Sequence, residues 1–116
     1  MHLLPAERAG LRIIDAERVC QAVAALHPED VRVRARNFAV LADPTRLTLL
    51  TCISAAGPIS VSDLAAATGI QEATVSQTLR YLRIAQVVST ERDGRIIRYQ
   101  LAGGPVTALL TAKTCI

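Results

Sequence analysis

Residues 71–101 read QEATVSQTLRYLRIAQVVSTERDGRIIRYQL, and this stretch decides the fold. Its first half places Val75, Leu79 and Leu82 four and three positions apart, which is the spacing of a helix that buries one face. Its second half holds two apolar runs on either side of Asp93-Gly94. This dipeptide favours a two-residue hairpin turn with positive φ at both central positions. The stretch therefore predicts an amphipathic helix followed at once by a β-hairpin.

The exposed face of this predicted helix carries side chains suited to reading DNA, namely Ser76, Gln77, Arg80 and Arg83. Arginine donates two hydrogen bonds to guanine, glutamine pairs with adenine, and serine contacts a base edge or a phosphate. Polar residues also cover the solvent face of any surface helix. The face by itself is therefore compatible with a DNA-reading surface and with an ordinary solvated one.

The predicted hairpin has strands at residues 87–92 and 95–101, with Arg92 and Arg95 at its tip and Arg98 further along. Cations at a hairpin tip beside a DNA-reading helix are well placed to contact phosphates. The alternative is a charged edge that prevents strands of different molecules from pairing. Beside a helix with a polar reading face, the first interpretation is favoured.

Capping signals predict four helices before residue 71. These helices cover residues 16–26, 31–42, 44–56 and 61–68, with N-caps at Asp15, Asp30, Asp43 and Ser60. Pro44 at the first helical position strengthens the third, and the capping-box spacing from Ser60 to Asp63 strengthens the fourth. The fourth helix ends at Gly69, and only Ile70 and Gln71 separate it from the amphipathic helix. Two short helices joined by so tight a turn are the signature of a helix-turn-helix.

The second of these segments has alternating Val and Arg at its start, which would also suit a strand. A helix is favoured because the apolar spacing continues far enough to place Val31, Ala35, Phe38 and Leu41 on one face. A last helix is expected within residues 105–116. Its apolar residues and those of the first helix form a surface that needs a partner.

The chain has 116 residues, which suits one domain and is too short for separate substrate and cofactor domains. With one Phe, two Tyr and no Trp, the expected core is aliphatic and mainly helical. No apolar run approaches the roughly 20 residues of a membrane span. Pro5, Glu7 and Arg8 interrupt the N-terminus too early for a signal peptide. A cytoplasmic protein that does not enter a membrane is expected.

The net charge of +3 is unevenly distributed. Residues 1–43 carry six basic and six acidic side chains, whereas residues 44–116 carry seven basic and four acidic ones. The excess therefore lies in the half that holds the amphipathic helix and the hairpin, as a surface that binds a polyanion requires.

Sequence motifs argue against an enzyme and against a disulfide framework. The chain has no glycine-rich phosphate loop and no His-Glu-x-x-His, and neither histidine stands in a recognisable nucleophile motif. Three cysteines, an odd number without CxxC spacing, indicate reduced thiols.

Three segments together resemble the ArsR/SmtB family of metalloregulatory repressors. FAVLADPTRLTLL resembles the family's entry into its second core helix, ATVSQTLRYLRIAQVV its recognition helix and exit, and ERDGRIIRYQL its wing. The resemblance covers roughly residues 37–101. Two positions depart from it: Thr78 stands where many members have His, and Gln86 stands where Gly usually ends the helix.

The resemblance implies one winged helix-turn-helix domain, mainly α with a small β-hairpin. Residues 44–101 would form the helix-turn-helix and wing, and residues 1–42 and 105–116 would hold a homodimer together through the first and last helices. The family implies binding to double-stranded operator DNA, most often by a repressor that a metal ion or another small effector releases. Carried over by position, the DNA contacts would be Thr74, Ser76, Gln77, Thr78, Arg80, Arg92 and Arg95. The alternative is a winged helix that binds protein, since a fold does not fix a function.

The residues with which members of the family bind metals are missing from three places. The Cys-x-Cys element before the recognition helix is replaced by Ser60-Val61-Ser62, and residues 105–116 contain no Asp, Glu or His. The recognition helix itself has no cysteine. An effector site, if the chain has one, is therefore expected elsewhere.

Two other groups of residues are candidates. His27, Glu29 and Asp30 suit nickel or zinc if His2 or a group from the other protomer completes the ligand set, and the alternative is a polar surface turn capped by Asp30.

Cys52 and Cys115 loosely resemble the thiol pair of family members that respond to persulfides. Cys52 lies about one position off that pattern, which turns it by roughly 100° around a helix. The alternative for Cys52, and for Cys20, is a small buried apolar residue.

Overall fold

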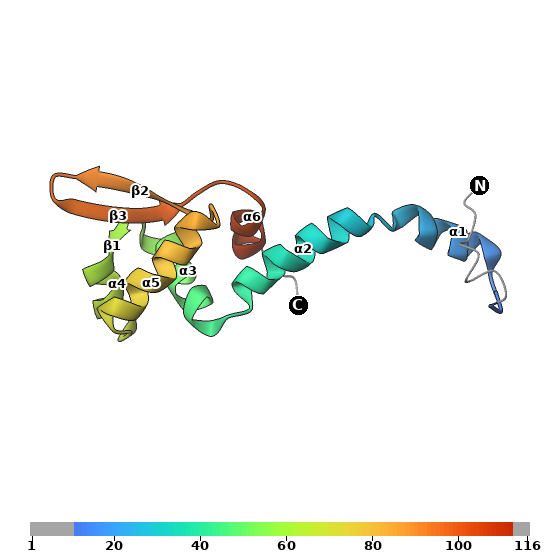
Figure 1. The fold of residues 1–116 in the computed structure, drawn as a ribbon, viewed down its shortest axis with the longest axis horizontal. Helices are drawn as coiled ribbons and strands as arrows, with labels where there is room; N and C mark the ends of the chain where they lie inside the picture. The colour runs from blue at the N-terminus through green and yellow to red at the C-terminus, as the bar shows by residue number, and fades with distance from the viewer. Residues whose placement is uncertain (1–10, 113–116) are drawn as a thin grey trace. The chain divides into compact units, whose positions relative to one another are not determined.

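The computed structural model describes residues 11–112 (Figure 1). Its helices and strands, in chain order, are α1 (Ala16–Ala25), α2 (Pro28–Leu41), α3 (Pro44–Ala56), β1 (Ile59–Ser60), α4 (Val61–Thr68), α5 (Glu72–Ile84), β2 (Val88–Asp93), β3 (Ile96–Leu101) and α6 (Pro105–Thr111). The chain forms two compact units, and the division between them falls within α2, after Ala35. The helical content with one small sheet confirms the predicted fold class.

The first unit confirms the predicted cap of α1 and corrects that of α2. Asp15 accepts a hydrogen bond from the backbone N–H of Arg18 over 3.1 Å, as an N-cap does. Asp30, predicted to cap the next helix, lies inside its first turn because α2 begins at Pro28. Proline has a helical φ and lacks the N–H that the first helical position leaves unpaired. Glu29 and Asp30 are then stabilised by the helix dipole.

The helix predicted over residues 31–42 is confirmed, and the residues of its apolar face differ in burial. Val31 is 54% exposed and Phe38 is 55% exposed, and only Leu41 of the predicted face packs against the core. The buried residue of α2 is Val40, which is rotated by about 100° from Leu41 around the helix. Helical spacing thus identified the helix, but the side that packs on the core depends on neighbours distant in sequence.

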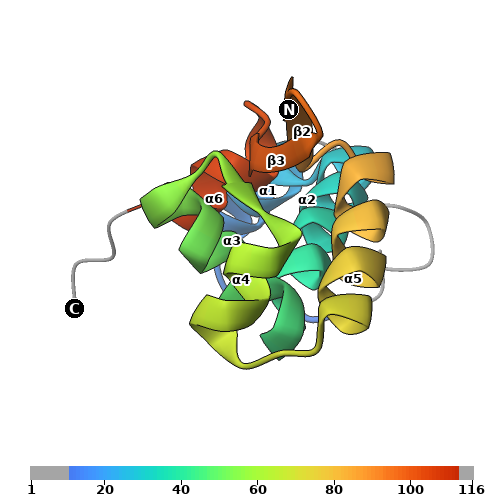
Figure 2. The same ribbon diagram turned by 90° about the vertical axis from the view of Figure 1, so that its left-hand side faces the viewer.

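In the second unit, α3, α4 and α5 surround an aliphatic core, and the sheet lies on one side of these helices (Figures 1 and 2). The buried core residues are Val40, Leu49, Leu50, Ile53, Leu64, Val75, Leu79, Leu82, Val87, Val88 and Val106. Leu64 comes from α4, and Leu79 and Leu82 come from α5; all three are 0% exposed. The predicted buried face of the amphipathic helix is therefore confirmed, and it fixes α5 with its polar side outward.

Local capping positions the helix-turn-helix as predicted. Asp43 accepts from the backbone N–H of Arg46 over 2.9 Å, and Ser60 accepts from that of Asp63 over 3.2 Å. Gly69 ends α4 with a φ of 75°, a left-handed conformation that glycine adopts without steric cost. α5 begins at Glu72, so the turn between the two helices is short.

Gln86, which stands where the resembled family usually has Gly, follows α5 in the left-handed conformation with a φ of 63°. Its N–H donates to Arg83 O over 3.0 Å, and the N–H of Val87 donates to Leu82 O over 2.9 Å. These two bonds define a Schellman motif, whose left-handed position is usually glycine. The motif turns the chain directly from α5 into β2.

Gln86→Gly is expected to stabilise the protein by about 0.5–1 kcal/mol. The substitution relieves a left-handed side chain that costs about 1–2 kcal/mol, and the greater chain entropy of glycine offsets part of that gain. The melting temperature, followed by circular dichroism, should rise by several degrees. Gln86→Ala is the control, since it keeps a Cβ atom and should bring no such rise. An unchanged or lower melting temperature for the glycine variant would contradict the argument.

The sheet contains a strand that the sequence did not predict. β1 is two residues long and pairs with β3, giving the antiparallel order β1-β3-β2. Ile59 lies opposite Tyr99, and Ser60 opposite Arg98. A two-residue strand is too short to show the alternation that identifies strands. It ties the start of α4 to the hairpin and so holds the helix-turn-helix beside the wing.

The hairpin is confirmed, but its turn lies one residue later than predicted. Asp93 pairs with Ile96 as the last residues of the two strands, so Gly94 and Arg95, not Asp93 and Gly94, are the central turn residues. Gly94 has a φ of 62° and Arg95 does not have a positive φ. Glycine at the first central position is the pattern of a type II′ turn, whereas the prediction assumed type I′. Arg95 therefore stands at the end of the hairpin.

The last described helix, α6, begins at Pro105 as predicted and buries Val106. The prediction extended it to residue 116, and residues 113–116 lie outside the described part. No single helix within residues 11–112 is long and apolar enough to cross a membrane, while the bent pair of α2 and α3 meets that test by length and composition alone.

Candidate nucleic-acid interface

The solvent face of α5 carries the side chains predicted to read DNA. Thr74, Ser76, Gln77 and Arg80 are exposed, and Thr78 is half-buried. The opposite face is anchored in the core by fully buried residues. The polar side chains consequently project from a backbone that core packing holds in place, which limits the entropy lost when they bind a ligand.

The polar atoms of this face are not engaged elsewhere in the described chain. Helical threonines often bond back to the carbonyl four residues earlier, as Thr48 and Thr51 of α3 do over 2.7 Å each. The hydroxyls of Thr74 and Thr78 make no such bond within residues 11–112, and Arg80 makes no ion pair there. These groups are free to bind a partner without breaking an internal bond.

A furrow of about 570 Å³ separates α5 from the hairpin. Its walls are Ser76 of α5, the first turn of α4 with the residue before it, and the start of β3; the lining residues are Ser60, Val61, Ser62, Asp63, Ser76, Arg95, Ile96, Ile97, Arg98 and Tyr99. The helical side carries the hydroxyls of Ser62 and Ser76 beside the carboxylate of Asp63, and the strand side carries the guanidinium groups of Arg95 and Arg98. We call it the wing furrow.

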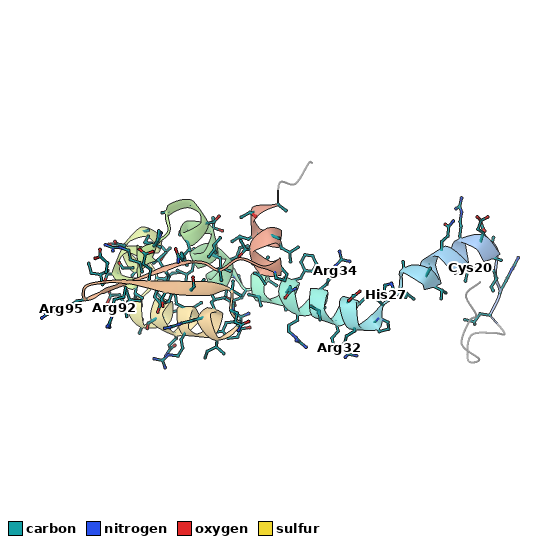
Figure 3. All side chains as sticks on the ribbon, turned by 90° about the horizontal axis from the view of Figure 1, so that it is seen from above. Cys20, His27, Arg32, Arg34, Arg92 and Arg95 are labelled. Atoms are coloured by element: carbon teal, nitrogen blue, oxygen red, sulfur yellow. The ribbon has the colours of Figure 1, made fainter. Side chains whose placement is uncertain are left out.

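The arginines of the hairpin differ in exposure and in whether an internal ion pair holds the side chain. Arg92 and Arg95 lie at the free end of the hairpin (Figure 3), and both are exposed. Arg98 is half-buried, and its guanidinium donates to the carboxylate of Asp93 over 2.9 Å. Two of the three cations are thus available to an anion, and the third is held by an internal ion pair.

A second furrow, of about 390 Å³, lies between α5 and the first turn of α3. It is lined by Asp43, Thr45, Arg46, Thr74, Gln77, Thr78 and Tyr81. The guanidinium carbon of Arg46 stands 4.2 Å from the centre of the Tyr81 ring, within the range of a cation–π interaction. The sequence does not predict this pair, because the two residues lie 35 positions apart and no local pattern joins them. We call this furrow the α3 furrow.

Comparison with known proteins places this geometry in a family. A helix-turn-helix domain model matches residues 41–90. The transcriptional repressor SmtB homolog of Synechocystis is 43% identical over 75 residues, which are 65% of this chain and 56% of that protein. The regulator NmtR of Mycobacterium tuberculosis is 42% identical over 76 residues, covering 66% and 62% respectively. The crystal structure of the repressor BigR from Xylella fastidiosa matches with a TM-score of 0.62 and 33% identity, over 72% of this chain and 86% of that one. The chain belongs to the ArsR/SmtB family.

Family membership confirms the predicted resemblance and the winged helix-turn-helix fold. The ArsR/SmtB family is made up of transcriptional regulators, which are not enzymes. The matched part of this ArsR/SmtB chain spans less than two thirds of the two curated relatives, 56% of one and 62% of the other.

The described residues do not supply metal ligands at the positions expected for an ArsR/SmtB protein. Ser60 and Ser62 stand at the start of α4, and Ser60 is already engaged as its N-cap. Serine hydroxyls do not replace the thiolates that select soft metals. Across residues 11–112, no group of three His, Cys, Asp or Glu side chains is placed to hold a metal ion.

The alternative metal candidates are close in sequence but do not assemble into a site. His27 precedes α2, and Glu29 and Asp30 lie in its first turn, all three exposed. Glu29 accepts a hydrogen bond from Arg32 over 2.8 Å. Nickel or zinc binding at this turn stays a prediction that requires ligands from other residues, since zinc normally takes four. His2, one of the ligands considered, lies outside the described residues.

Cys52 is half-buried and packs against the core of the second unit. This placement fits the alternative of a small apolar residue. Cys115, its predicted thiol partner, lies outside the described residues, so the pair stays a prediction. Cys20 is half-buried on α1.

Proposed function

We propose that this chain is a DNA-binding transcriptional regulator that acts in the cytoplasm as a homodimer on double-stranded operator DNA, and that it represses transcription until an effector releases it. The observation that carries the proposal is the outward face of α5, whose hydroxyl, amide and guanidinium groups are exposed and unbonded within the described chain. These groups match the donors and acceptors of base edges in a major groove. Family membership favours this function over the alternative of a protein-binding winged helix.

Recognition would divide between base edges and phosphates. Gln77 and Arg80, exposed on the outward face of α5, would contact bases. The hydroxyls of Thr74, Ser76 and Thr78 would contact base edges or phosphates at the sides of the groove. Arg92 and Arg95 at the end of the wing would neutralise phosphates beside the adjacent minor groove. Phosphate contacts set the register of the protein on DNA, and base contacts select the sequence.

Dimerisation is supported by apolar residues that the single chain leaves uncovered. α1, all of whose residues are described, has no buried residue, although its sequence is amphipathic. Leu26 and Val31 in the same unit are 55% and 54% exposed. We place the dimer contacts in residues 1–42 and 105–116. A two-fold dimer would present two α5 helices to successive major grooves, about 34–36 Å apart along the duplex.

An effector would act by binding the DNA-competent and DNA-incompetent forms of the dimer with different affinities. The free energy that couples the two ligands is then reciprocal, so operator DNA weakens effector binding by the same factor. The two candidate effector sites are the turn at His27, Glu29 and Asp30, for nickel or zinc, and the thiols of Cys52 and Cys115. Each needs groups beyond those that the described chain brings together.

Fluorescence anisotropy on a labelled duplex from upstream of the protein's own gene tests the function. We expect specific binding with a log–log salt slope several units negative, near −0.9 for each phosphate neutralised. An unrelated duplex of equal length should bind orders of magnitude more weakly. Nickel, zinc, cobalt, arsenite and a persulfide donor, added in turn, would identify an effector by loss of anisotropy. Equal, weak binding to both duplexes would instead support the protein-binding alternative.

Asp93→Asn is expected to tighten DNA binding at low salt. The substitution removes a carboxylate beside the wing tip and frees Arg98, which Asp93 now holds at 2.9 Å. If Arg98 then contacts a phosphate, the salt slope should become more negative by about 0.9 per protomer. The gain should shrink as salt rises, and the stability should change by less than about 1 kcal/mol because the Asp93 side chain is 73% exposed.

Asp93→Glu, which keeps the charge, is the control for this experiment and should bind like the wild type. Unaltered affinity and slope for Asp93→Asn would show that Arg98 does not reach the duplex.

A further inference from the structure

We propose that Arg46, held by Tyr81, is a second backbone-phosphate contact, on the side of α5 opposite the wing. The proposal rests on the proposed function, because it assigns a phosphate-binding role to the α3 furrow of the same DNA interface. Arg46 stands in the first turn of α3, outside the helix pair α4 and α5 and outside the hairpin.

The two furrows lie on opposite sides of α5. Ser76 lines the wing furrow, whereas Thr74 and Thr78 line the α3 furrow. Residues two positions apart on a helix are separated by about 200° around its axis, so Ser76 points away from both threonines. Arg80 lies on the outward face between the two furrows, and Gln77 stands beside it at the edge of the α3 furrow.

This arrangement matches the shape of a major groove. A helix that enters the groove has a phosphate backbone on each side of it. The wing supplies cations on one side through Arg92 and Arg95. Arg46 supplies a cation on the other side, in a furrow whose remaining polar groups include the hydroxyls of Thr45, Thr74 and Thr78. A phosphate needs this combination of a guanidinium and hydroxyl donors.

Arg46 is positioned in advance of binding. Its guanidinium carbon lies 4.2 Å from the Tyr81 ring centre, and the residue is half-buried. Among the described residues it makes no ion pair. A planar guanidinium that stacks on a ring keeps its N–H groups free at the edge. Less side-chain freedom is therefore lost when it binds an anion.

Asp43 is the acidic residue of the α3 furrow, and its charge opposes an anion there. Its carboxylate accepts the backbone N–H of Arg46 over 2.9 Å as the N-cap of α3. The Arg46 side chain is not within 4 Å of that carboxylate and lies against Tyr81 instead. The cap therefore uses the backbone of Arg46 and leaves its guanidinium for a partner.

Anisotropy titrations of the intact dimer with operator DNA test the proposal through Arg46→Ala. The salt slope should become less negative by about 0.9 per protomer. Because the two slopes differ by about 1.8 for the dimer, the loss of affinity should be about tenfold larger at 50 mM than at 200 mM salt. The loss should be equal for the operator and for operators with single base changes, since a phosphate contact carries no sequence information.

Variants of the ring test the positioning role of Tyr81. Tyr81→Phe keeps the ring and should bind like the wild type, whereas Tyr81→Leu should weaken binding with the slope unchanged, because the charge remains. In a double-mutant cycle, Tyr81→Leu should cost little once Arg46 is alanine. Melting curves confirm that each variant folds; Arg46→Ala retains the backbone N–H that Asp43 caps, so the helix start is kept.

Several outcomes overturn the proposal. An unchanged salt slope for Arg46→Ala would show that Arg46 does not contact a phosphate. A loss of affinity that depends on one base pair would show that Arg46 reads a base instead. If the losses of affinity are additive in the double-mutant cycle, Tyr81 does not position Arg46. Failure of the wild type to prefer its operator over the unrelated duplex is a different result, because it defeats the proposed function itself.

Discussion

Replacing Arg80 by alanine is expected to weaken operator binding by about 1–3 kcal/mol for each base pair that it reads, or roughly 5- to 150-fold per protomer. Arg80 lies on the outward face of α5, is exposed and makes no ion pair within the described chain. A bidentate contact to guanine uses two of the five N–H groups of the guanidinium fork. In the proposed dimer, which would carry two copies, the total loss on a symmetric operator should be about twice that of one half-site.

The measurement is anisotropy with the operator and with duplexes that carry one altered base pair in each half-site. At the pair that Arg80 reads, the wild type should discriminate between bases and the alanine variant should not. Arg80→Lys is the matched control, because it keeps the charge and loses the planar fork. The lysine variant should keep the phosphate-dependent salt slope and lose discrimination. Undiminished affinity of Arg80→Ala for the operator would remove this residue from the reading face.

The parts of the fold that the sequence predicted are those with local causes. Asp43 and Ser60 cap helices through residues three positions away, and Gly69 ends α4 within the same few residues. The buried face of α5 follows from helical spacing alone. The reading side chains were predictable for the same reason, since the buried face determines which residues point outward.

The parts that the sequence did not predict depend on contacts between distant residues. The hairpin turn shifted by one residue because the pairing of Asp93 with Ile96 is set along the whole ladder and not by the Asp-Gly dipeptide. Likewise, α2 packs on the core through Val40 and Leu41, and which of its residues do so depends on contacts with other elements. Arg46 and Tyr81 come together only through the packing of α3 against α5. Such pairs leave no periodic signal in a single sequence.

Leu79→Ala is expected to destabilise the protein by about 2–5 kcal/mol, the largest stability effect among the substitutions considered. Leu79 is 0% exposed on the buried face of α5. Its truncation loses apolar burial and leaves a cavity among side chains that relax only in part. Arg80→Ala, one position further along the same helix, should change the stability by less than about 0.5 kcal/mol because the residue is on the surface.

Urea unfolding of both variants at one fixed protein concentration measures the difference, since the stability of a dimer depends on concentration. The two variants test the two faces of α5. Leu79 should determine whether the reading surface is folded, and Arg80 should determine which DNA sequence that surface binds. At low temperature and low urea, where Leu79→Ala remains folded, its operator affinity and its discrimination between bases should approach those of the wild type. A Leu79→Ala variant as stable as the wild type would mean that α5 is not anchored through this residue.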